Sequence, residues 1–194
     1  MSEKNYSRYV IEGKYVVLTS YDDEYQDFIY SCHCDMSMRM FWTDEREFYG
    51  YNQFIEHFQT ELRRFYHVYF IILDKKSKLP VGFVYSYNFN RSDGLLYETI
   101  YICPKYQSRG YGAEAGLLFS NYLFCFFPIR KIYCDVYGYN SKSQQLLKGV
   151  GFKLEGQLRE HRYFNGAYHD MYRFATFRDE FYKNNQKRIS WYQS

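Results

Sequence analysis

Three β-rich runs follow one another in the middle of this chain, and only short turns separate them. They read "HVYFIILD" (67–74), "VGFVYSYNF" (81–89) and "LLYETIYIC" (95–103), with "KKSKLP" and "NRSDG" between them. Parallel strands need a crossover of a dozen or more residues, so turns this short require antiparallel neighbours. The chain is therefore expected to build an antiparallel meander, which a doubly wound parallel fold does not contain.

One strand and two helices are expected before the meander. "KYVVLT" (14–19) predicts a strand, and Ser20 followed by two aspartates predicts the start of a helix. Thr43, followed by two carboxylates, predicts the start of a second helix. We expect that helix to continue to Phe65, because apolar residues recur three and four positions apart along it.

A helix, a strand, a short helix and a long hairpin are expected after the meander. The first helix follows "QSRGYG" (107–112), the strand covers 131–137, and Ser141 with Gln144 has the pattern of a capping box. Asn165-Gly166 is typical of the tight turn of a hairpin. This order predicts a single α+β domain over residues 1–194, with a mixed, mostly antiparallel sheet and helices on both faces.

Composition narrows the class of protein further. The chain has 194 residues, of which 46% are hydrophobic, and this favours one folded domain. Aromatic residues reach 23% and indicate a core built largely from rings. The net charge of +3 is too small to indicate nucleic-acid binding. The most apolar stretch, 117–127, is too short to span a membrane. We expect a soluble, cytoplasmic protein with a loosely held polar tail at 183–194.

The cysteines predict neither disulfides nor a metal site. Five cysteines at irregular spacing fit free thiols in a reducing compartment. Cys32-His33-Cys34 has two metal-binding side-chain types, but no second pair with suitable spacing completes a four-ligand zinc site. We therefore expect no bound metal.

The stretch "QSRGYGAEA" (107–115) places two glycines between a strand and a helix. Such a turn can direct successive backbone N–H groups at an anion, near the positive end of the helix dipole. Gly110 and Gly112 would permit unusual backbone conformations and keep side chains away from a phosphate, and Arg109 adds charge. An ordinary glycine-bearing turn is the plainer interpretation. The Walker motif is excluded because its Lys-Ser/Thr ending is missing, and "GYGAEA" fits the Rossmann fingerprint but follows an antiparallel meander.

Two stretches together resemble a known family. "ICPKYQSRGYGAEA" (102–115) is similar to the acetyl-CoA loop of the GNAT superfamily of N-acetyltransferases. "YNSKSQQLLKGVGFKLEGQLREHRYFNGAYHDM" (139–171) resembles the region that follows in the RimJ/RimL-like branch. The resemblance is specific over about 79–177, which it implies to be the acetyl-CoA-binding core. It is weak over the early helices (20–65), which would form the acceptor side.

The resemblance implies a set of residues around acetyl-CoA. The N–H groups of the glycine loop would hold the pyrophosphate, and Gln107 would shape the entry to the loop. Two central strands would splay apart, so that main-chain groups around Ile102 bind the pantetheine arm and one N–H polarises the thioester carbonyl. The cofactor-binding residues implied in this way are Ile102, Gln107, Ser108, Arg109, Gly110, Tyr111, Gly112, Ala113, Asn140 and Ser143. The alternative to cofactor binding is a solvent-exposed position for Ser143 and a local capping role for Asn140.

The implied chemistry is direct attack of a neutral amine on the thioester. The resemblance implies Glu98 as the candidate base, because it lies in the strand leading to Ile102 and matches an acidic position common in this branch. Glu98 shares one face of that strand with Ile100 and Ile102, and a structural ion pair is the alternative. Many family members carry a tyrosine where this chain has Leu147. The proton for the leaving thiolate would then come from water or from Tyr137 or Tyr139, or the thiolate would leave unaided.

The acceptor is left open between a small-molecule amine and a protein N-terminus. Polyamines, amino sugars and antibiotics are the small molecules that the branch offers. Four acidic residues near the gap between the early helices are a weak hint of a cationic acceptor, although three of them have the position of first-turn carboxylates. These residues are Asp35, Asp44, Glu45 and Glu47. The competing hypothesis is a non-catalytic acyl-CoA-binding module. A homodimer is compatible with the aromatic content, but the sequence does not specify it.

Overall fold

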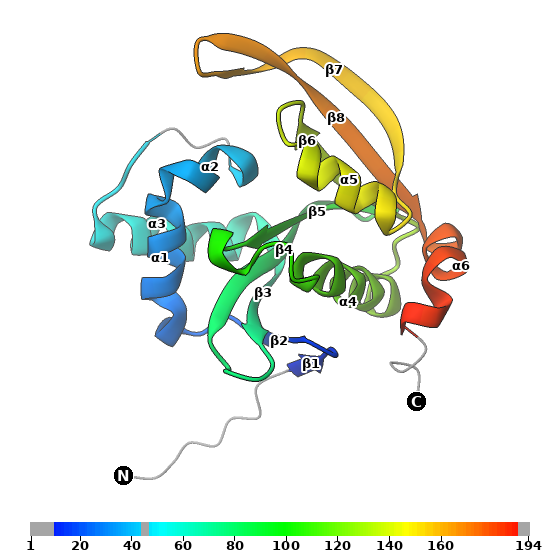
Figure 1. Cartoon of the computed structure of the whole chain (residues 1–194), viewed down its shortest axis with the longest axis horizontal. Helices are drawn as coiled ribbons and strands as arrows, with labels where there is room; N and C mark the ends of the chain where they lie inside the picture. Colours follow the sequence, from blue (N-terminus) through cyan, green and yellow to red (C-terminus); the bar gives the residue numbers. More distant parts are fainter. Residues whose placement is uncertain (1–9, 44–46, 190–194) are drawn as a thin grey trace.

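The computed structural model describes residues 10–43 and 47–189, and these form one eight-stranded sheet with helices on both faces (Figure 1). The strand order is β1-β2-β3-β4-β5-β6-β8-β7, and all neighbouring strands are antiparallel except β5 and β6. The strands are β1 (Val10–Glu12), β2 (Val16–Ser20), β3 (Tyr66–Asp74), β4 (Pro80–Asn90), β5 (Leu95–Ile102), β6 (Lys131–Tyr137), β7 (Lys153–Phe164) and β8 (Ala167–Phe177). The predicted α+β class and the antiparallel meander, β3 to β5, are confirmed.

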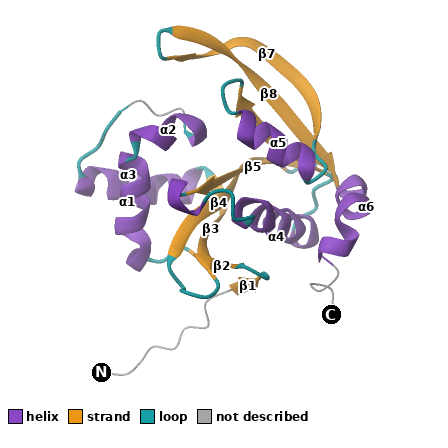
Figure 2. Ribbon diagram, viewed as in Figure 1, coloured by secondary structure: helices purple, strands orange, loops and turns teal. Residues whose placement is uncertain are grey.

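Within the described residues, six α-helices lie on the two faces of this sheet (Figure 2). They are α1 (Gln26–Cys34), α2 (Met36–Trp42), α3 (Tyr51–Arg64), α4 (Tyr111–Phe126), α5 (Ser141–Gly149) and α6 (Arg178–Ile189). Helices α1, α2 and α3 cover one face, while α4, α5 and α6 lie toward the other. The chain therefore has two separate apolar cores, one on each side of the strands.

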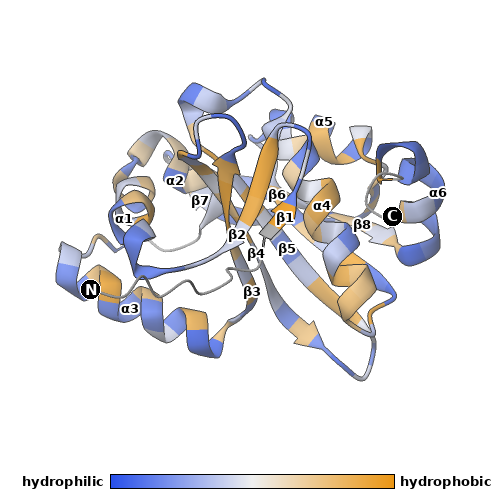
Figure 3. Cartoon of the chain, turned by 90° about the horizontal axis from the view of Figure 1, so that it is seen from below, coloured by the Kyte–Doolittle hydropathy of each residue, from blue (hydrophilic) through white to orange (hydrophobic). Residues whose placement is uncertain are grey.

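The two cores differ in composition. The core beside α4 combines Leu, Ile and Val side chains with phenylalanines, and α4 is mostly orange in the hydropathy view of Figure 3. The core beside α1 and α3 is built mainly from rings, such as the parallel pair Phe83 and Tyr101, whose centroids lie 4.8 Å apart. Rings thus occur in both cores, and they dominate the core beside α1 and α3.

Two predicted helix starts are wrong. Ser20 ends β2, and a single 3-10 turn over Asp23–Tyr25 leads into α1. Thr43 has extended backbone at the end of α2, and α3 begins only at Tyr51, after Gly50. Carboxylates after a threonine are typical of a first helical turn. The start of α3 instead follows from the phenylalanines that it buries against the sheet.

Two other local predictions are also wrong. The side chain of Asn140, not that of Ser141, accepts from the Ser143 N–H at the start of α5, and the Gln144 amide donates to the Gly138 carbonyl. Residues 183–189 of the expected polar tail form the second half of α6, whereas 190–194 lie outside the described residues. Asn185 of α6 is buried and donates to the carbonyls of Val150 and Phe181, so polar residues here are held by hydrogen bonds.

Candidate active site

The strands β5 and β6 separate partway along their length. They pair in parallel only from Leu95↔Lys131 to Tyr97↔Tyr133, although β5 continues to Ile102 and β6 to Tyr137. Beyond Tyr97 and Tyr133 the sheet therefore divides, as the expected splayed central pair requires.

The pairing pattern shows where the main chain of β5 points in this gap. Cys103 donates its N–H to the carbonyl of Val81 on the β4 side, and the main-chain groups of an antiparallel strand alternate in direction. The N–H and C=O groups of Glu98, Ile100 and Ile102 consequently point away from β4, toward the gap. The carbonyl of Ile102 accepts from the Gln107 side chain at 3.1 Å, which leaves its N–H as the group facing the opening.

The glycine loop lies at the end of this gap and uses its two glycines for different reasons. Gly110 has φ +83°, a left-handed conformation, and a Cβ added there would meet nothing within 4 Å. A Cβ added to Gly112 would lie 3.3 Å from Leu146 and 3.5 Å from Ile102, so this glycine keeps the space between them open. Ser108 also has a positive φ, of 61°. Gly110 thus allows the backbone conformation of the turn, and Gly112 leaves space between Leu146 and Ile102.

A cleft of about 710 Å³ fills the gap between the strands and reaches the glycine loop. Among the expected site residues, it is lined by Glu98, Ile102, Gln107, Ser108, Gly112, Asn140 and Ser143. The side chains of Arg109, Tyr111 and Ala113 do not line it. Arg109 lies over the Tyr106 ring, the Tyr111 hydroxyl donates to Asp74, and Ala113 packs against the core beside α4. Gly110 is likewise not among the described residues that line the cleft.

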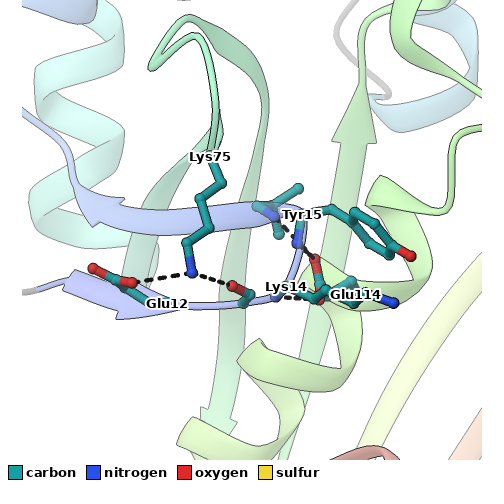
Figure 4. A network of polar contacts seen from close by, with 7 residues as sticks. Glu12, Lys14, Tyr15, Lys75 and Glu114 are labelled. Atoms are coloured by element: carbon teal, nitrogen blue, oxygen red, sulfur yellow. Dashed lines mark hydrogen bonds and ion pairs between the residues drawn. The ribbon is translucent and has the colours of Figure 1, made fainter.

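Glu114 fixes the beginning of α4 against the turn between β1 and β2 (Figure 4). Its carboxylate accepts three backbone N–H groups, from Lys14 at 2.6 Å, Tyr15 at 2.8 Å and Val16 at 2.9 Å. Lys75 adds an ion pair to Glu12 and donates to the Gly13 carbonyl beside it. The Glu114 carboxylate is therefore engaged by the β1–β2 turn, and Glu114 is not among the described residues that line the cleft.

Glu98 occupies the point where the two strands separate. It is fully buried, and the Ser120 hydroxyl lies 3.0 Å and 3.1 Å from its two carboxylate oxygens. The Cys134 thiol is 3.6 Å from one of them. Burial raises the pKa of the Glu98 carboxyl from 4.5 to about 8, and the hydrogen bonds from Ser120 and Cys134 oppose that rise. The expected alternative of a structural ion pair is not found among these contacts.

Helix α5 and the residues before it form another wall. Asn140 combines its capping bond with a place on the cleft, so the capping role expected as the alternative does not remove it from the site. Leu147 is buried on the same wall. Of the two tyrosines considered as proton donors, Tyr139 lines the cleft, and its hydroxyl donates to the Met40 carbonyl at 2.9 Å. Tyr137 is not among the described residues that line the cleft.

Of the four acidic residues expected near the acceptor, the two that the structure describes, Asp35 and Glu47, do not line this cleft. Asp35 caps α2 by accepting from the Ser37 N–H, and the Glu47 carboxylate accepts from the Tyr49 hydroxyl. Asp44 and Glu45 lie outside the described residues. Asp35 and Glu47 thus have local structural roles.

Residues that the sequence did not single out close the cleft on the side of α2. Met38, Phe41 and Trp42 line it, and the Phe41 ring lies 5.7 Å from that of Tyr139. The available signal was Asp35 followed by Ser37 and an apolar run, which is a weak but recognisable start for a short helix.

The comparison with protein-family models decides the family. Residues 16–153 match the model described as the acetyltransferase (GNAT) domain. The chain belongs to the GNAT acetyltransferase family. The match begins at β2, covers the separated strands and the glycine loop, and ends at the first residue of β7.

Related GNAT proteins include both partial and nearly full-length matches. The N-acetyltransferase YokL of Bacillus subtilis is 28% identical over 60% of this chain, which spans 65% of YokL. A spermidine N(1)-acetyltransferase of Escherichia coli is 30% identical over 42% of the chain, which spans 44% of that enzyme. The spermidine N(1)-acetyltransferase of Vibrio cholerae is 23% identical over 82% of this chain and 91% of its own length.

Solved structures show the same fold. The crystal structure of spermidine N-acetyltransferase from Vibrio cholerae in complex with CoA and spermine has a TM-score of 0.80 at 22% identity, over 87% of this GNAT chain and 99% of its own. A GCN5-related N-acetyltransferase from Brucella melitensis has a TM-score of 0.76 at 22% identity, over 95% and 86% of the two chains.

Two searches of the described residues gave negative results. No group of three or more His, Cys, Asp or Glu side chains in 10–43 and 47–189 is arranged to hold a metal ion. No helix in the same ranges is long and apolar enough to cross a membrane.

Proposed function

We propose that this chain transfers an acetyl group from acetyl-CoA to a primary amine by direct attack. The observation that carries the proposal is the separation of β5 from β6, which opens a cleft between the glycine loop and the buried Glu98. Membership of the GNAT family supports it. The acetyl-CoA thioester supplies the activated acyl group, and the residues of the chain bind it, orient it and handle the proton.

The fit of acetyl-CoA to this site is supported by the space beside Gly112. A Cβ there would already contact Leu146 at 3.3 Å and Ile102 at 3.5 Å, so a larger side chain would project into the space between them. We assign the N–H groups of 108–113 to the pyrophosphate, and Gln107 to shaping the entry through its bond to Ile102. The outward-facing main chain of Ile100 and Ile102 is assigned to the pantetheine arm, with the Ile102 N–H polarising the thioester carbonyl. Asn140 and Ser143 would complete this side of the arm.

The reaction forms one bond and breaks another. The amine nitrogen bonds to the carbonyl carbon, the C–S bond breaks, and the nitrogen loses a proton that is finally returned to the sulfur. Glu98 is the proposed proton acceptor in its ionised form, and a pKa raised to about 8 makes that carboxylate a stronger base than an exposed glutamate. The Tyr139 hydroxyl already donates to Met40, so we assign the return of the proton to water.

The proposed class of acceptors includes more than the substrate that any relative's name gives. Spermidine acetyltransferases among the relatives add a polyamine to the candidates, together with amino sugars, antibiotics and a protein N-terminus. The function proposed at this level is acetylation of a primary amine.

The test is release of free thiol from acetyl-CoA in the presence of a panel of amines, with acetyl-CoA binding measured by calorimetry. Gly112→Trp should abolish acetyl-CoA binding, because the ring fills the space between Ile102 and Leu146. Glu98→Gln should retain binding and lower kcat about 100-fold, as expected for loss of a proton acceptor. Phe65→Ala, at an exposed ring away from the cleft, is the control and should change neither quantity.

Three results would contradict parts of the proposal. Equal kcat in Glu98→Gln at saturating amine would remove Glu98 as the base. Undiminished acetyl-CoA binding by Gly112→Trp would remove the loop from the site. Binding without thiol release from any amine would instead favour the non-catalytic acyl-CoA-binding module.

A further inference from the structure

The cleft reaches both faces of the sheet, and its two sides have different linings. Side chains alternate along β5, so Ile100 and Ile102 belong to the core beside α4, whereas Tyr101 belongs to the core beside α1 and α3. The glycine loop and α5 border the first side, which we assigned to acetyl-CoA. The amine must approach from the other side, which α2 covers.

The side beneath α2 is lined mainly by rings. Phe41 and Trp42 project from α2, and Tyr139 closes the wall opposite them. The Trp42 ring is fixed by edge contacts to Phe83 at 5.1 Å and to Tyr101 at 5.8 Å. The bond from the Tyr139 hydroxyl to Met40 holds α2 against this wall. The acceptor therefore meets a firm aromatic surface.

The described residues on this side, which do not include Asp44 and Glu45, offer little negative charge. Among the described residues lining the cleft, the carboxylates are Glu98 and Asp135. Asp135 is paired through both oxygens with the Arg173 guanidinium, at 2.8 Å and 2.7 Å. Glu98 is buried against Ser120 and is assigned to the proton of the reacting amine, so it is not available to pair with a second ammonium group. Arg162 adds a positive charge beside the end of α2, where it donates to the Thr43 carbonyl.

The small number of carboxylates lining the cleft favours an acceptor with one positive charge over an acceptor with several. A monoamine loses its only charge when it gives up a proton, and its ammonium form can rest on the faces of aromatic rings beforehand. A polyamine would bring one or two further ammonium groups into the cleft, and desolvating them without a paired carboxylate is costly.

Resting on the acetyl-transfer function above, we propose that the preferred acceptor is a small amine with a single positive charge attached to an aromatic or other apolar group, held between Phe41, Trp42 and Tyr139. A polyamine is the excluded alternative.

The experiment compares 2-phenylethylamine with spermidine by thiol release, after calorimetry has established acetyl-CoA binding. The ratio kcat/KM should be at least about tenfold higher for 2-phenylethylamine. A dipeptide amide beginning with phenylalanine presents the same ring beside an α-amino group. Comparison of the two turnover rates shows whether the site prefers a free aromatic amine or a peptide with an aromatic N-terminal residue. The proposal requires 2-phenylethylamine to be acetylated faster than the dipeptide amide.

Variants at one position make the assignment specific. Phe41→Ala should lower kcat/KM for 2-phenylethylamine about tenfold and leave the KM for acetyl-CoA unchanged, which also shows that the fold is intact. Phe41→Glu should raise the spermidine rate relative to the 2-phenylethylamine rate, because it adds the missing carboxylate. Phe65→Ala, an exposed ring outside the cleft, is the matched control.

The outcomes separate this inference from the proposed function. Faster turnover of spermidine than of 2-phenylethylamine by the native chain would overturn the aromatic acceptor site and leave acetyl transfer intact. Equal loss of both activities in Phe41→Ala would overturn the role of that ring. Thiol release from neither amine, nor from any other in the panel, would overturn the proposed function and this inference with it.

Discussion

Gly110 and Gly112 are two residues apart, but each meets a different physical requirement. The turn at Gly110 needs a left-handed backbone, whereas the site at Gly112 needs the absence of a side chain. Sequence reasoning predicted both requirements, because strand, glycines and helix follow one another directly along the chain. It could not assign them to individual glycines, since only the tertiary structure brings Leu146 beside Gly112.

Glu98 makes the stability of the folded chain depend on pH. In the folded state its carboxyl keeps a proton up to a pH of about 8, because burial raises its pKa, whereas the ordinary pKa of a glutamate is 4.5. Between these two values the folded state binds more protons than the unfolded state, so stability falls as pH rises through this window. The contribution is complete below pH 4.5 and lost above pH 8.

We predict that Glu98→Gln removes this dependence. The variant should match the native chain near pH 5 and exceed its free energy of unfolding by a few kcal/mol at pH 9, since each pKa unit corresponds to about 1.4 kcal/mol. Urea unfolding of both proteins across this range measures the difference. A difference that stays constant with pH would mean that Glu98 is not a buried, titrating carboxyl.

At the scale of elements, α2 is a helix that the sequence analysis did not predict. The carboxylates after Thr43 resembled a helix start, yet the helix lies before them and is capped by Asp35. An isolated helix of this length is unstable, so tertiary contacts must hold it in place. Here they are the bond from Tyr139 to Met40 and the packing of Trp42 on the sheet.

We predict that Glu114→Ala weakens the joint between the β1–β2 turn and α4. Removal of the carboxylate leaves three backbone N–H groups without their acceptor, at a cost of about 2 kcal/mol in free energy of unfolding. Thermal or urea unfolding measures this loss, and amide exchange of Lys14, Tyr15 and Val16 should become faster. Glu56→Ala, at an exposed position of α3, should change neither. Unchanged exchange at these three amides would show that the clamp is dispensable.

At the scale of the whole molecule, α6 completes the core that the earlier elements leave open. Phe181 and Ile189 are buried, and the Phe181 ring lies 5.4 Å from that of Phe124 on α4. The low hydrophobicity of residues 183–194 suggested a loose tail, because polar residues outnumber the few that turn inward. The helix is nevertheless held by those few and by the two hydrogen bonds of Asn185.

We predict that Phe181→Ala lowers the free energy of unfolding by about 3–5 kcal/mol, as expected for loss of a fully buried ring. Phe126→Ala, at a ring that is 65% exposed on α4, should cost less than about 1 kcal/mol. Calorimetric titration of the folded variant should give native acetyl-CoA affinity, because Phe181 does not line the cleft. A loss below 1 kcal/mol would show that α6 contributes little to the core.

The amino-acid order was sufficient for the class of fold, the meander, the hairpin and the glycine loop. Each of these depends on residues that are close in sequence, where turn length, alternation and glycine conformation act locally. The division of the sheet between β5 and β6, the burial of Glu98 and the aromatic surface beneath α2 arise from contacts between distant segments. Their physical cause is packing, which pairs each strand with whichever neighbour best buries its side chains, and no local pattern encodes that choice.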